Sequence, residues 1–370
     1  MDEKKNAVFT ISLLATILLL FTIADLVDGE RIYSEMENRM LARKPKFSKE
    51  SLLSGEYSED YEEYVSDQFV SRDKWVEIKT RLDILLQKKD INGVYLGADN
   101  YLIEQHLPED YTEQMEQDKV AMLKKLVDEW DAQVMLVPTA DNILTDKLPA
   151  YADYYDETRL LELVRASVGT DHYVDVYHAL EDHREEEIYY RTDHHWTTLG
   201  AYYGYLAWTE TTGQRARLYN MENMTTVSDD FQGTLHSRVP VVRTTDPIQV
   251  LPMVSSELHV TYDQQTTADT LFEEKYLSTK NQYGYFLDDN HAIVEIQTRY
   301  VTGGTLFVIK DSYANCLIPL LVPHYGKIYV VDPRYYNGSL SALMESVESE
   351  KGMDVLVLYN CVHFLEEFRY

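Results

Sequence analysis

The sequence is poor in cysteine and in positive charge. Its two cysteines, Cys316 and Cys361, are too few for a disulfide-rich scaffold or a four-cysteine zinc site. Both lie in apolar stretches, so we expect buried free thiols. Lys and Arg number 34 against 63 Asp and Glu, a formal charge of −29. Because phosphate backbones and anionic membrane surfaces are bound by clustered cations, nucleic acid is not expected as a partner, nor is broad adhesion to an anionic membrane.

The sequence also lacks internal repeats. No segment of about 20–50 residues recurs, which argues against a solenoid. Hydrophobic residues make up 45% of the chain, too large a share for a wholly disordered protein. A length of 370 residues exceeds what one small domain needs.

A long uncharged run occupies the N-terminal region, from Ala7 to Ala24. A hydrocarbon core takes about 20 apolar residues to cross, and the run approaches that length. It ends in Asp25 to Asp28, unlike the small-residue exit of a cleaved signal peptide. Lys4 and Lys5 precede it and acids follow, so the positive-inside rule predicts a cytoplasmic N-terminus. We therefore predict a single-pass signal anchor in the cell membrane; the alternative is a buried helix of a soluble protein.

Beyond the anchor, the chain changes pattern twice. Apolar residues at helical spacing among many charges, such as Tyr57, Tyr61 and Tyr64, predict a helical stalk. Further along, helix and strand signals alternate, which is typical of a parallel sheet flanked by helices, an α/β fold. The expected parts are a cytoplasmic tail at 1–6, the anchor at 7–27, the stalk at 28–90, and a catalytic domain at 91–370 with an inserted β-rich segment at 209–300.

The alternation predicts individual elements of this domain. The expected strands are 134–137, 173–176, 306–309, 328–331 and 355–358. The expected helices are 120–130, 160–164, 199–208, 316–321 and 340–347.

Two short segments carry residues suited to nucleophilic catalysis. Asp193 and His195 precede the predicted helix at 199–208, and Ser312 lies between an apolar strand and a short helix. Such a strand–turn–helix exposes the nucleophile of α/β hydrolases and aims amide donors at an oxyanion. A serine needs a base, and the base needs a carboxylate that holds its tautomer. In an open α/β sheet, reacting groups gather at the carboxyl ends of strands. We therefore predict Ser312, His195 and Asp193 as a catalytic triad.

These residues also have simpler interpretations. Asp193 and Ser312 each precede a helix and are suited to capping it, while His195 beside a tryptophan fits an aromatic cluster. A metal bound by Asp193, His194 and His195 is a further alternative. Asp311, directly before Ser312, would repel a developing oxyanion if its side chain pointed inward.

The motif of Asp193, His194, His195 and Trp196 resembles the bacterial DHHW-motif family. More broadly, it is similar to SGNH-hydrolase-like domains of alginate and exopolysaccharide O-acetylation proteins. Their Asp-x-His-Trp-Thr segment is matched by Asp193, His195, Trp196 and Thr197, and their later Ser-Tyr pair by Ser312 and Tyr313. Looser matches are Glu37-Asn38-Arg39, Asp67-Gln68-Phe69 with Arg72, Val137-Pro138, and Asp332-Pro333-Arg334.

The resemblance implies an SGNH-hydrolase-like fold and an extracytoplasmic O-acetyltransferase or carbohydrate esterase. It would act on a cell-surface or secreted polysaccharide through an acyl-enzyme on Ser312. No cofactor is implied, whereas a membrane-bound O-acyltransferase partner would supply the acyl group. The backbone N–H of Ser312 is the expected oxyanion donor. Further candidates for oxyanion or substrate binding are Tyr313, Arg334, Trp196 and Tyr190.

Two other functions stay open at this point. One is a non-catalytic polysaccharide-binding or scaffolding subunit of an export or modification complex, and the other is D-alanyl transfer to teichoic acid. The charge of −29 favours a neutral glycan acceptor, although salt screens this effect beyond about 8 Å. Tyrosine rings stack well on sugars, so four tyrosines near the motif are candidates for a groove wall: Tyr189, Tyr190, Tyr202 and Tyr203.

Overall fold

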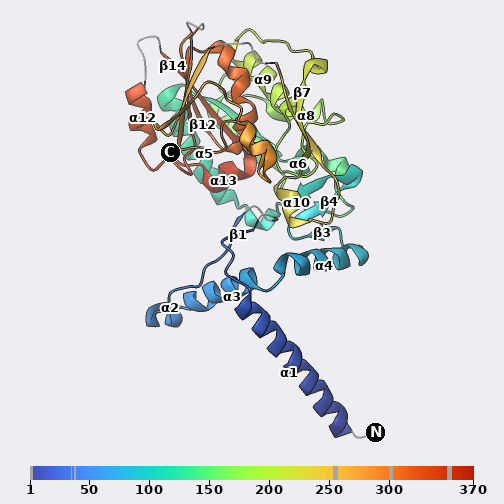
Figure 1. Cartoon of the computed structure of the whole chain (residues 1–370). Coiled ribbons are helices and arrows are strands. Elements are labelled where there is room, and N and C mark those ends of the chain that lie inside the picture. Colours follow the sequence, from blue (N-terminus) through green and yellow to red (C-terminus); the bar gives the residue numbers. More distant parts are fainter. Residues whose placement is uncertain (1–2, 35, 37–38, 253–256, 300–302, 348–351) are drawn as a thin grey trace. The chain divides into compact units, whose positions relative to one another are not determined.

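A computed structural model describes residues 3–34, 36, 39–252, 257–299, 303–347 and 352–370. Glu37 and Asn38 of the resemblance therefore lie outside the described residues. The chain divides into two compact units (Figure 1). The first comprises Met1–Lys88 and Val239–Val241, and the second Lys89–Arg238 and Val242–Tyr370.

The first unit begins with helix α1, Glu3–Val27. Its segment Lys5–Asp25 is long and apolar enough to cross a membrane, by length and composition. The predicted N-terminal helix is thus present, and its ability to span agrees with a single-pass anchor.

The rest of this unit consists of short elements joined by polar side chains. They are β1 Tyr33–Ser34, β2 Arg39–Met40, α2 Lys49–Ser54, α3 Glu56–Gln68 and α4 Arg72–Leu85. At the end of α3, the Asp67 carboxylate accepts a hydrogen bond from the Ala42 amide at 2.8 Å. The Gln68 amide group bonds both backbone groups of Arg31, each at 2.9 Å. These contacts tie Arg31 and Ala42 to the end of α3.

The second unit is built on a seven-stranded mixed sheet in the order β10-β9-β11-β13-β12-β14-β6. The strands are β6 Gln133–Val137, β9 Leu258–Tyr262, β10 Thr266–Ala268, β11 Ile293–Thr298, β12 Thr305–Lys310, β13 Lys327–Val331 and β14 Met353–Asn360. Strands β13, β12, β14 and β6 are parallel, whereas β11, β9 and β10 add antiparallel pairs. The predicted parallel sheet therefore holds for four strands only.

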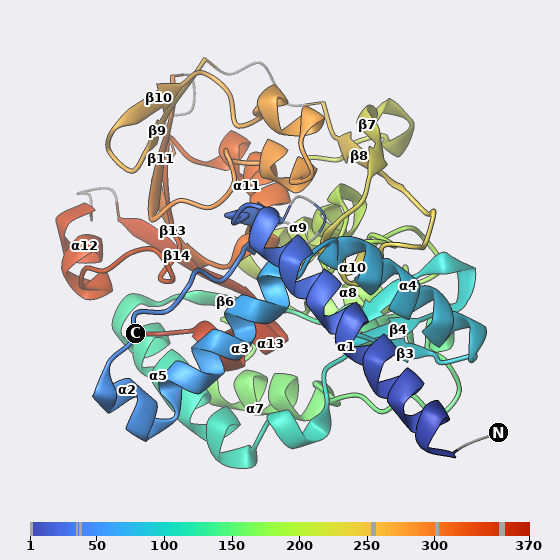
Figure 2. The same cartoon turned by 60° about the horizontal axis from the view of Figure 1, so that its bottom comes forward.

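Helices cover both faces of this sheet (Figure 2). Strand β12 is buried along its whole length, and its side chains alternate between two hydrophobic clusters. Phe307 packs in the cluster that includes residues of α5, α7, α12 and α13, while Val308 packs in the cluster that includes residues of α8, α9 and α11. A strand buried on both faces is expected to be continuously apolar, which is why the sequence marks it clearly.

Of the helices whose bounds follow, five correspond to predicted ones, whereas those at 176–181 and 361–367 were not predicted. The bounds are α5 Glu113–Trp130, α7 Thr158–Val168, α8 Val176–Glu181, α9 Thr198–Thr212, α11 Ile318–Leu321, α12 Leu340–Val347 and α13 Cys361–Glu367. The predicted strand at 173–176 is wrong. Only Tyr173 forms a bridge, to Val134. The Asp175 side chain then accepts from the His178 amide and starts α8, a typical N-cap.

Residues 209–300 contribute to two sheets. Strands β7 Thr225–Phe231 and β8 Asp246–Val250 pair with each other, whereas β9, β10 and β11 extend the central sheet. Smaller elements of the unit are α6 Ala140–Ile143, α10 Thr234–Arg238, β3 Asp90–Ile91, β4 Val94–Leu96 and β5 Leu102–Glu104. Both cysteines are buried and free, as predicted.

Candidate active site

Ser312 lies on the turn that follows the central strand β12. The turn, Ser312–Cys316, is a short 3₁₀ helix with Asp311 as its N-cap residue. The Asp311 carboxylate accepts from the Tyr313 amide at 2.9 Å. Because β12 lies between two parallel neighbours, Ser312 stands at the carboxyl end of the parallel strands, where side chains of open α/β sheets act on ligands.

The structure brings Ser312, His195 and Asp193 into one hydrogen-bonded line. The Nε2 atom of His195 lies 2.8 Å from the Ser312 Oγ, and its Nδ1 atom lies 2.5 Å from an Asp193 oxygen. An ionised carboxylate can only accept, so His195 Nδ1 donates and Nε2 accepts from the serine hydroxyl. The three residues are 7%, 5% and 3% exposed, respectively. This arrangement is able to take a proton from Ser312.

Asp193 is held in the ionised state by its surroundings. Burial alone would raise its pKa, but the neighbouring His194 and His195 and the hydrogen bonds lower it well below the usual range. One carboxylate oxygen accepts from both the amide and the hydroxyl of Thr234, at 2.8 and 3.1 Å. Gly233 leaves the room for this contact, since a Cβ there would lie 2.2 Å from the same oxygen.

Tyr283 completes the support of His195. Its ring stacks on the imidazole at 3.9 Å with an interplanar angle of 12°, and its hydroxyl donates to the Ser312 carbonyl at 3.1 Å. The sequence gives no local signal for Tyr283, Gly233 or Thr234, because all three lie in the polar segment 209–300. Only the fold brings them to the motif.

The side chain of Asp311 has its own partners. One oxygen accepts from the Asn360 amide at 2.9 Å and from His363 Nδ1 at 2.8 Å. Burial would raise the pKa of Asp311, but His363 lowers it. Among the described residues, no group accepts a hydrogen bond from the Ser312 amide. That N–H is therefore free to stabilise an oxyanion.

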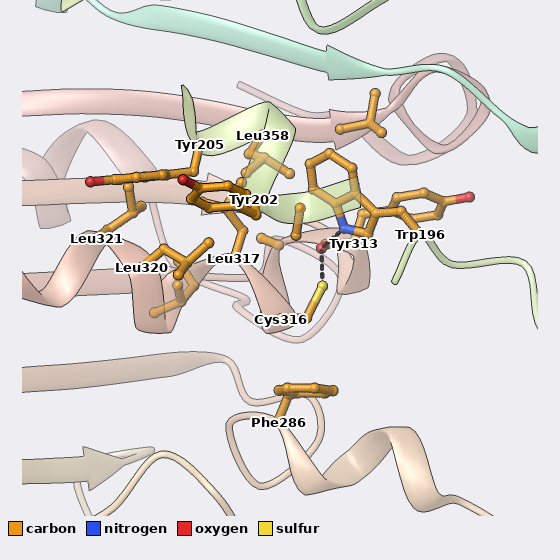
Figure 3. Packing of buried hydrophobic residues seen from close by; sticks show 14 of the residues in the cluster. Trp196, Tyr202, Tyr205, Phe286, Tyr313, Cys316, Leu317, Leu320, Leu321 and Leu358 are labelled. Carbon is orange, nitrogen blue, oxygen red and sulfur yellow. Dashed lines mark hydrogen bonds between the residues drawn. The ribbon is translucent and has the colours of Figure 1, made fainter. Parts of the chain in front are cut away.

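Three further candidate residues lie in the core around this turn. Trp196, Tyr313 and Tyr190 are 0%, 1% and 2% exposed. The Trp196 indole donates a hydrogen bond to the Tyr313 carbonyl at 2.7 Å. The same carbonyl accepts from the Cys316 thiol at 3.7 Å (Figure 3). In this structure Trp196 and Tyr313 pack at the turn that carries Ser312, and contact of the three side chains with substrate stays a prediction.

Arg334 is engaged in ion pairs. Its guanidinium donates to both oxygens of Asp332, at 2.9 and 2.7 Å, and lies 3.5 Å from Glu367. Asp332 in turn lies 3.4 Å from the buried Lys310 ammonium. A role for Arg334 toward an oxyanion or substrate stays a prediction.

The four tyrosines expected in a groove wall separate into two groups. Tyr189, Tyr190 and Tyr202 are buried. Tyr203 is half-buried, stacks on His183 at 3.6 Å, and lines a polar cleft of about 510 Å³. None of the three triad residues lines this cleft.

The metal alternative depends on atoms that are already hydrogen-bonded. Asp193, His194 and His195 form the one group of possible ligands found in the described part of the chain, with ligand atoms within 4.8 Å of one another. A metal there would compete with the bonds from His195 to Ser312 and from Thr234 to Asp193. These residues fit a hydrogen-bonded triad better than a metal centre.

Fold and site together define an α/β protein with a buried Asp-His-Ser line at the end of a parallel strand. A family model described as DHHW protein matches residues 132–331. The chain therefore belongs to the DHHW family, and its Asp193, His194, His195 and Trp196 form the motif of that name.

Solved structures share the fold. A DHHW family protein from Eubacterium siraeum is 24% identical with a TM-score of 0.62, over 74% of this chain and 92% of that one. Bacillus cereus PatB1 with a sulfonyl adduct is 19% identical with a TM-score of 0.59, over 75% and 98%. PatB1 in a second structure is 18% identical with a TM-score of 0.58, over 73% and 98%. No curated protein matches the chain.

Proposed function

We propose that this protein is a membrane-anchored, extracytoplasmic O-acetyltransferase or esterase of a polysaccharide, with an SGNH-type Ser-His-Asp site. The observation that carries the proposal is the line from Asp193 through His195 to Ser312, with contacts of 2.5 and 2.8 Å. The resemblance of Asp193, His195, Trp196 and Thr197 to polysaccharide O-acetylation proteins supports the substrate class.

The reaction would proceed in two displacements. In the first, His195 accepts the hydroxyl proton of Ser312 while the Oγ atom forms an ester bond with the acetyl carbon. The imidazolium, held by Asp193, then returns the proton to the departing group of the donor. In the second, His195 takes the proton of an acceptor hydroxyl, whose oxygen forms an ester bond with the acetyl carbon. The bond from that carbon to the Ser312 Oγ atom breaks, and the imidazolium returns the proton to Ser312. A sugar hydroxyl gives transfer, and water gives hydrolysis.

The oxyanion of both steps would form next to the Ser312 amide. Removal of one such donor typically costs about 10²–10³ in rate. Asp311 does not oppose this charge directly, since its carboxylate accepts hydrogen bonds from Tyr313, Asn360 and His363.

The anchor would place the site outside the cytoplasm. Lys4 and Lys5 before the apolar segment favour a cytoplasmic N-terminus. Because acetyl-CoA is a cytoplasmic donor, the acetyl group would have to be passed across the membrane by a membrane-bound O-acyltransferase, as the family resemblance implies. A neutral glycan is the favoured acceptor for a chain of charge −29.

Acyl-enzyme trapping on the full chain in detergent tests the proposal. The protein is exposed to p-nitrophenyl acetate, and separately to phenylmethylsulfonyl fluoride, and adducts are located by mass spectrometry. We expect one adduct of each kind on Ser312, absent from Ser312→Ala and His195→Ala. Ser278→Ala, which changes an exposed serine of the same unit, is the matched control and should label like the wild type.

A folded protein with no adduct on Ser312 from either reagent contradicts the proposal. That result would favour the non-catalytic polysaccharide-binding or scaffolding subunit. Adducts that persist in His195→Ala at an unchanged rate would contradict the assigned base.

A further inference from the structure

A small pocket adjoins the turn that carries Ser312. Its wall includes Tyr313, which follows the serine, His194, which precedes the base, and His363, which binds Asp311. Glu104 and His106 close the other side. Three histidines thus line one pocket that borders Tyr313, the residue after Ser312, and the three triad residues are not part of its lining.

The hydrogen bonds around His194 fix which of its nitrogens accepts. Its Nδ1 lies 2.8 Å from the Thr234 hydroxyl. That hydroxyl has one proton and donates it to the ionised Asp193, so it accepts from His194 Nδ1–H. The Nε2 atom therefore carries a lone pair. It has no partner among the described residues and is not sealed from solvent, so it is open to a ligand in the pocket that His194 lines.

The other two histidines are each held by a carboxylate. Nδ1 of His106 lies 3.2 Å from Asp141 and Nδ1 of His363 lies 2.8 Å from Asp311. Burial would lower the pKa of both, but the carboxylate partners outweigh it, so that the pKa of His106 rises to about 9 and that of His363 is also raised. Burial lowers the pKa of His194 to about 3. With its pKa at about 9, the His106 ring is protonated at neutral pH and offers an Nε2–H donor, and Glu104 adds an acceptor.

These groups suit a neutral hydroxyl. A hydroxyl both donates and accepts, whereas a carboxylate would face Glu104 and the lone pair of His194, and an ammonium would face the protonated His106 ring. The pocket has room for about one water-sized group. It is therefore large enough for a single hydroxyl and too small for a sugar ring.

We propose that this pocket binds a second hydroxyl of the acceptor, next to the one that reacts, and that His194 Nε2 accepts its hydrogen bond. The inference rests on the proposed transferase function and names its acceptor class as a neutral polyol. It also gives the first histidine of the motif a role distinct from that of His195. Water has the same chemistry as a ligand and would occupy the pocket in hydrolysis.

Partitioning of the acyl-enzyme tests this role. The full chain in detergent is acetylated with p-nitrophenyl acetate, and glycerol, which has neighbouring hydroxyls, competes with 1-propanol, which has one. We expect the wild type to acetylate glycerol about tenfold more efficiently per hydroxyl, the scale of one neutral hydrogen bond. The products are quantified by gas chromatography, and the p-nitrophenolate burst reports acylation separately.

Two variants of His194 form a matched pair. In His194→Asn the amide remains near the Nδ1 position, so the contact with Thr234 is kept while the acceptor in the pocket is lost. The glycerol preference should then fall to about one. In His194→Gln the amide oxygen can reach the Nε2 position, and we expect most of the preference to remain. Thermal unfolding checks that both variants are folded.

The outcomes separate the two proposals. A wild type without a burst contradicts the proposed function itself. A burst with equal use of the two alcohols, or an unchanged preference in His194→Asn, contradicts the polyol pocket alone. A burst followed only by hydrolysis identifies the pocket as a water site and overturns the sugar assignment.

Discussion

Two histidine–aspartate pairs lie next to Ser312, and only the first presents a ring nitrogen to the serine hydroxyl. In the first pair, His195 Nδ1 contacts Asp193 at 2.5 Å and Nε2 contacts the serine hydroxyl. In the second, His363 Nδ1 contacts Asp311 at 2.8 Å, and the ring lines the small pocket instead. The same two residue types thus place a ring nitrogen against the Ser312 hydroxyl in one pair, and cap a turn and line a pocket in the other.

The backbone explains the difference. Asp193 and His195 are two residues apart on an irregular segment, so one carboxylate oxygen reaches both the amide and the ring of His195. Asp311 instead accepts from the amides of Tyr313 and Asn360. The second aspartate therefore stabilises the turn on which the nucleophile stands, while the first fixes a tautomer.

The strongest expected effect separates the two aspartates. In Asp193→Asn the amide no longer holds His195 in the required tautomer, and acylation should fall by about 10⁴-fold. In Asp311→Asn the Ser312–His195 contact stays, so the loss of acylation should be at least tenfold smaller, and the variant should be about 1–3 kcal/mol less stable. Burst kinetics and thermal unfolding measure both. Equal losses of acylation would remove the distinction between the pairs.

Gly233→Ala tests how tightly the first pair is fixed. The added Cβ would lie 2.2 Å from the Asp193 oxygen, so the carboxylate must move. A displacement of about 1 Å typically costs about 10² in rate, and we expect a loss of that order in the p-nitrophenolate burst. Gly304→Ala provides a control for glycine loss remote from Asp193, since its Cβ would meet only the Gly352 carbonyl at an ordinary contact distance of 3.8 Å. Normal acylation by Gly233→Ala would show that Asp193 tolerates displacement.

Parts of this site and fold were predictable because they are local. Ser312 follows a continuously apolar strand, and Asp193 and His195 belong to one motif, so their residue types and order indicate the triad. The strands β9 and β11 were not predicted as members of the central sheet, since polar residues interrupt their apolar pattern. Tyr283 contacts His195 from a distant segment, and no sequence period encodes such a contact.

The polar residues around the turn were harder to assign for a different reason. Arg334 was a candidate for substrate because it follows a strand end, but an arginine there has the same sequence signature when it pairs with an aspartate. The structure gives it Asp332 as a partner. The folded structure decides which charged group an arginine pairs with. The sequence alone therefore does not distinguish an arginine that binds substrate from one in an ion pair.

The second pair should contribute a pH-dependent stability. The pKa of His363 is raised above 6.5, burial being outweighed by Asp311 and Glu367, with Arg334 opposing. His194 is the further titratable ring beside it. Because the folded-state pKa of His363 is raised, its pair with Asp311 stabilises the folded protein fully below pH 6.5. This stabilisation is lost as the pH rises through the folded-state pKa. The pKa of Asp311 is lowered, so this carboxylate contributes stability above pH 3.8. The contribution is lost as the pH falls through its folded-state pKa.

The comparison of wild type with His363→Gln measures the pH-dependent contribution of His363 to stability. The difference in Tm should be largest between about pH 5 and 6 and should shrink toward alkaline pH. His178→Gln, whose exposed ring pairs with Asp175, is the control and should change little, as exposed pairs contribute about 0–1 kcal/mol. A difference that grows with pH would contradict the assigned sign.

The smallest effect on acylation is expected from Tyr283→Phe, which separates the ring contact of Tyr283 from the hydrogen bond of its hydroxyl. The ring still stacks on His195, and only the hydroxyl bond to the Ser312 carbonyl is lost. A single neutral hydrogen bond contributes about 0.5–1.5 kcal/mol, so acylation should fall by less than about tenfold. Tyr283→Ala removes the stacking as well and should cost clearly more in the same burst assay. If the two variants lose the same activity, the hydroxyl and not the ring positions the base, and the stacked face of His195 needs no aromatic partner.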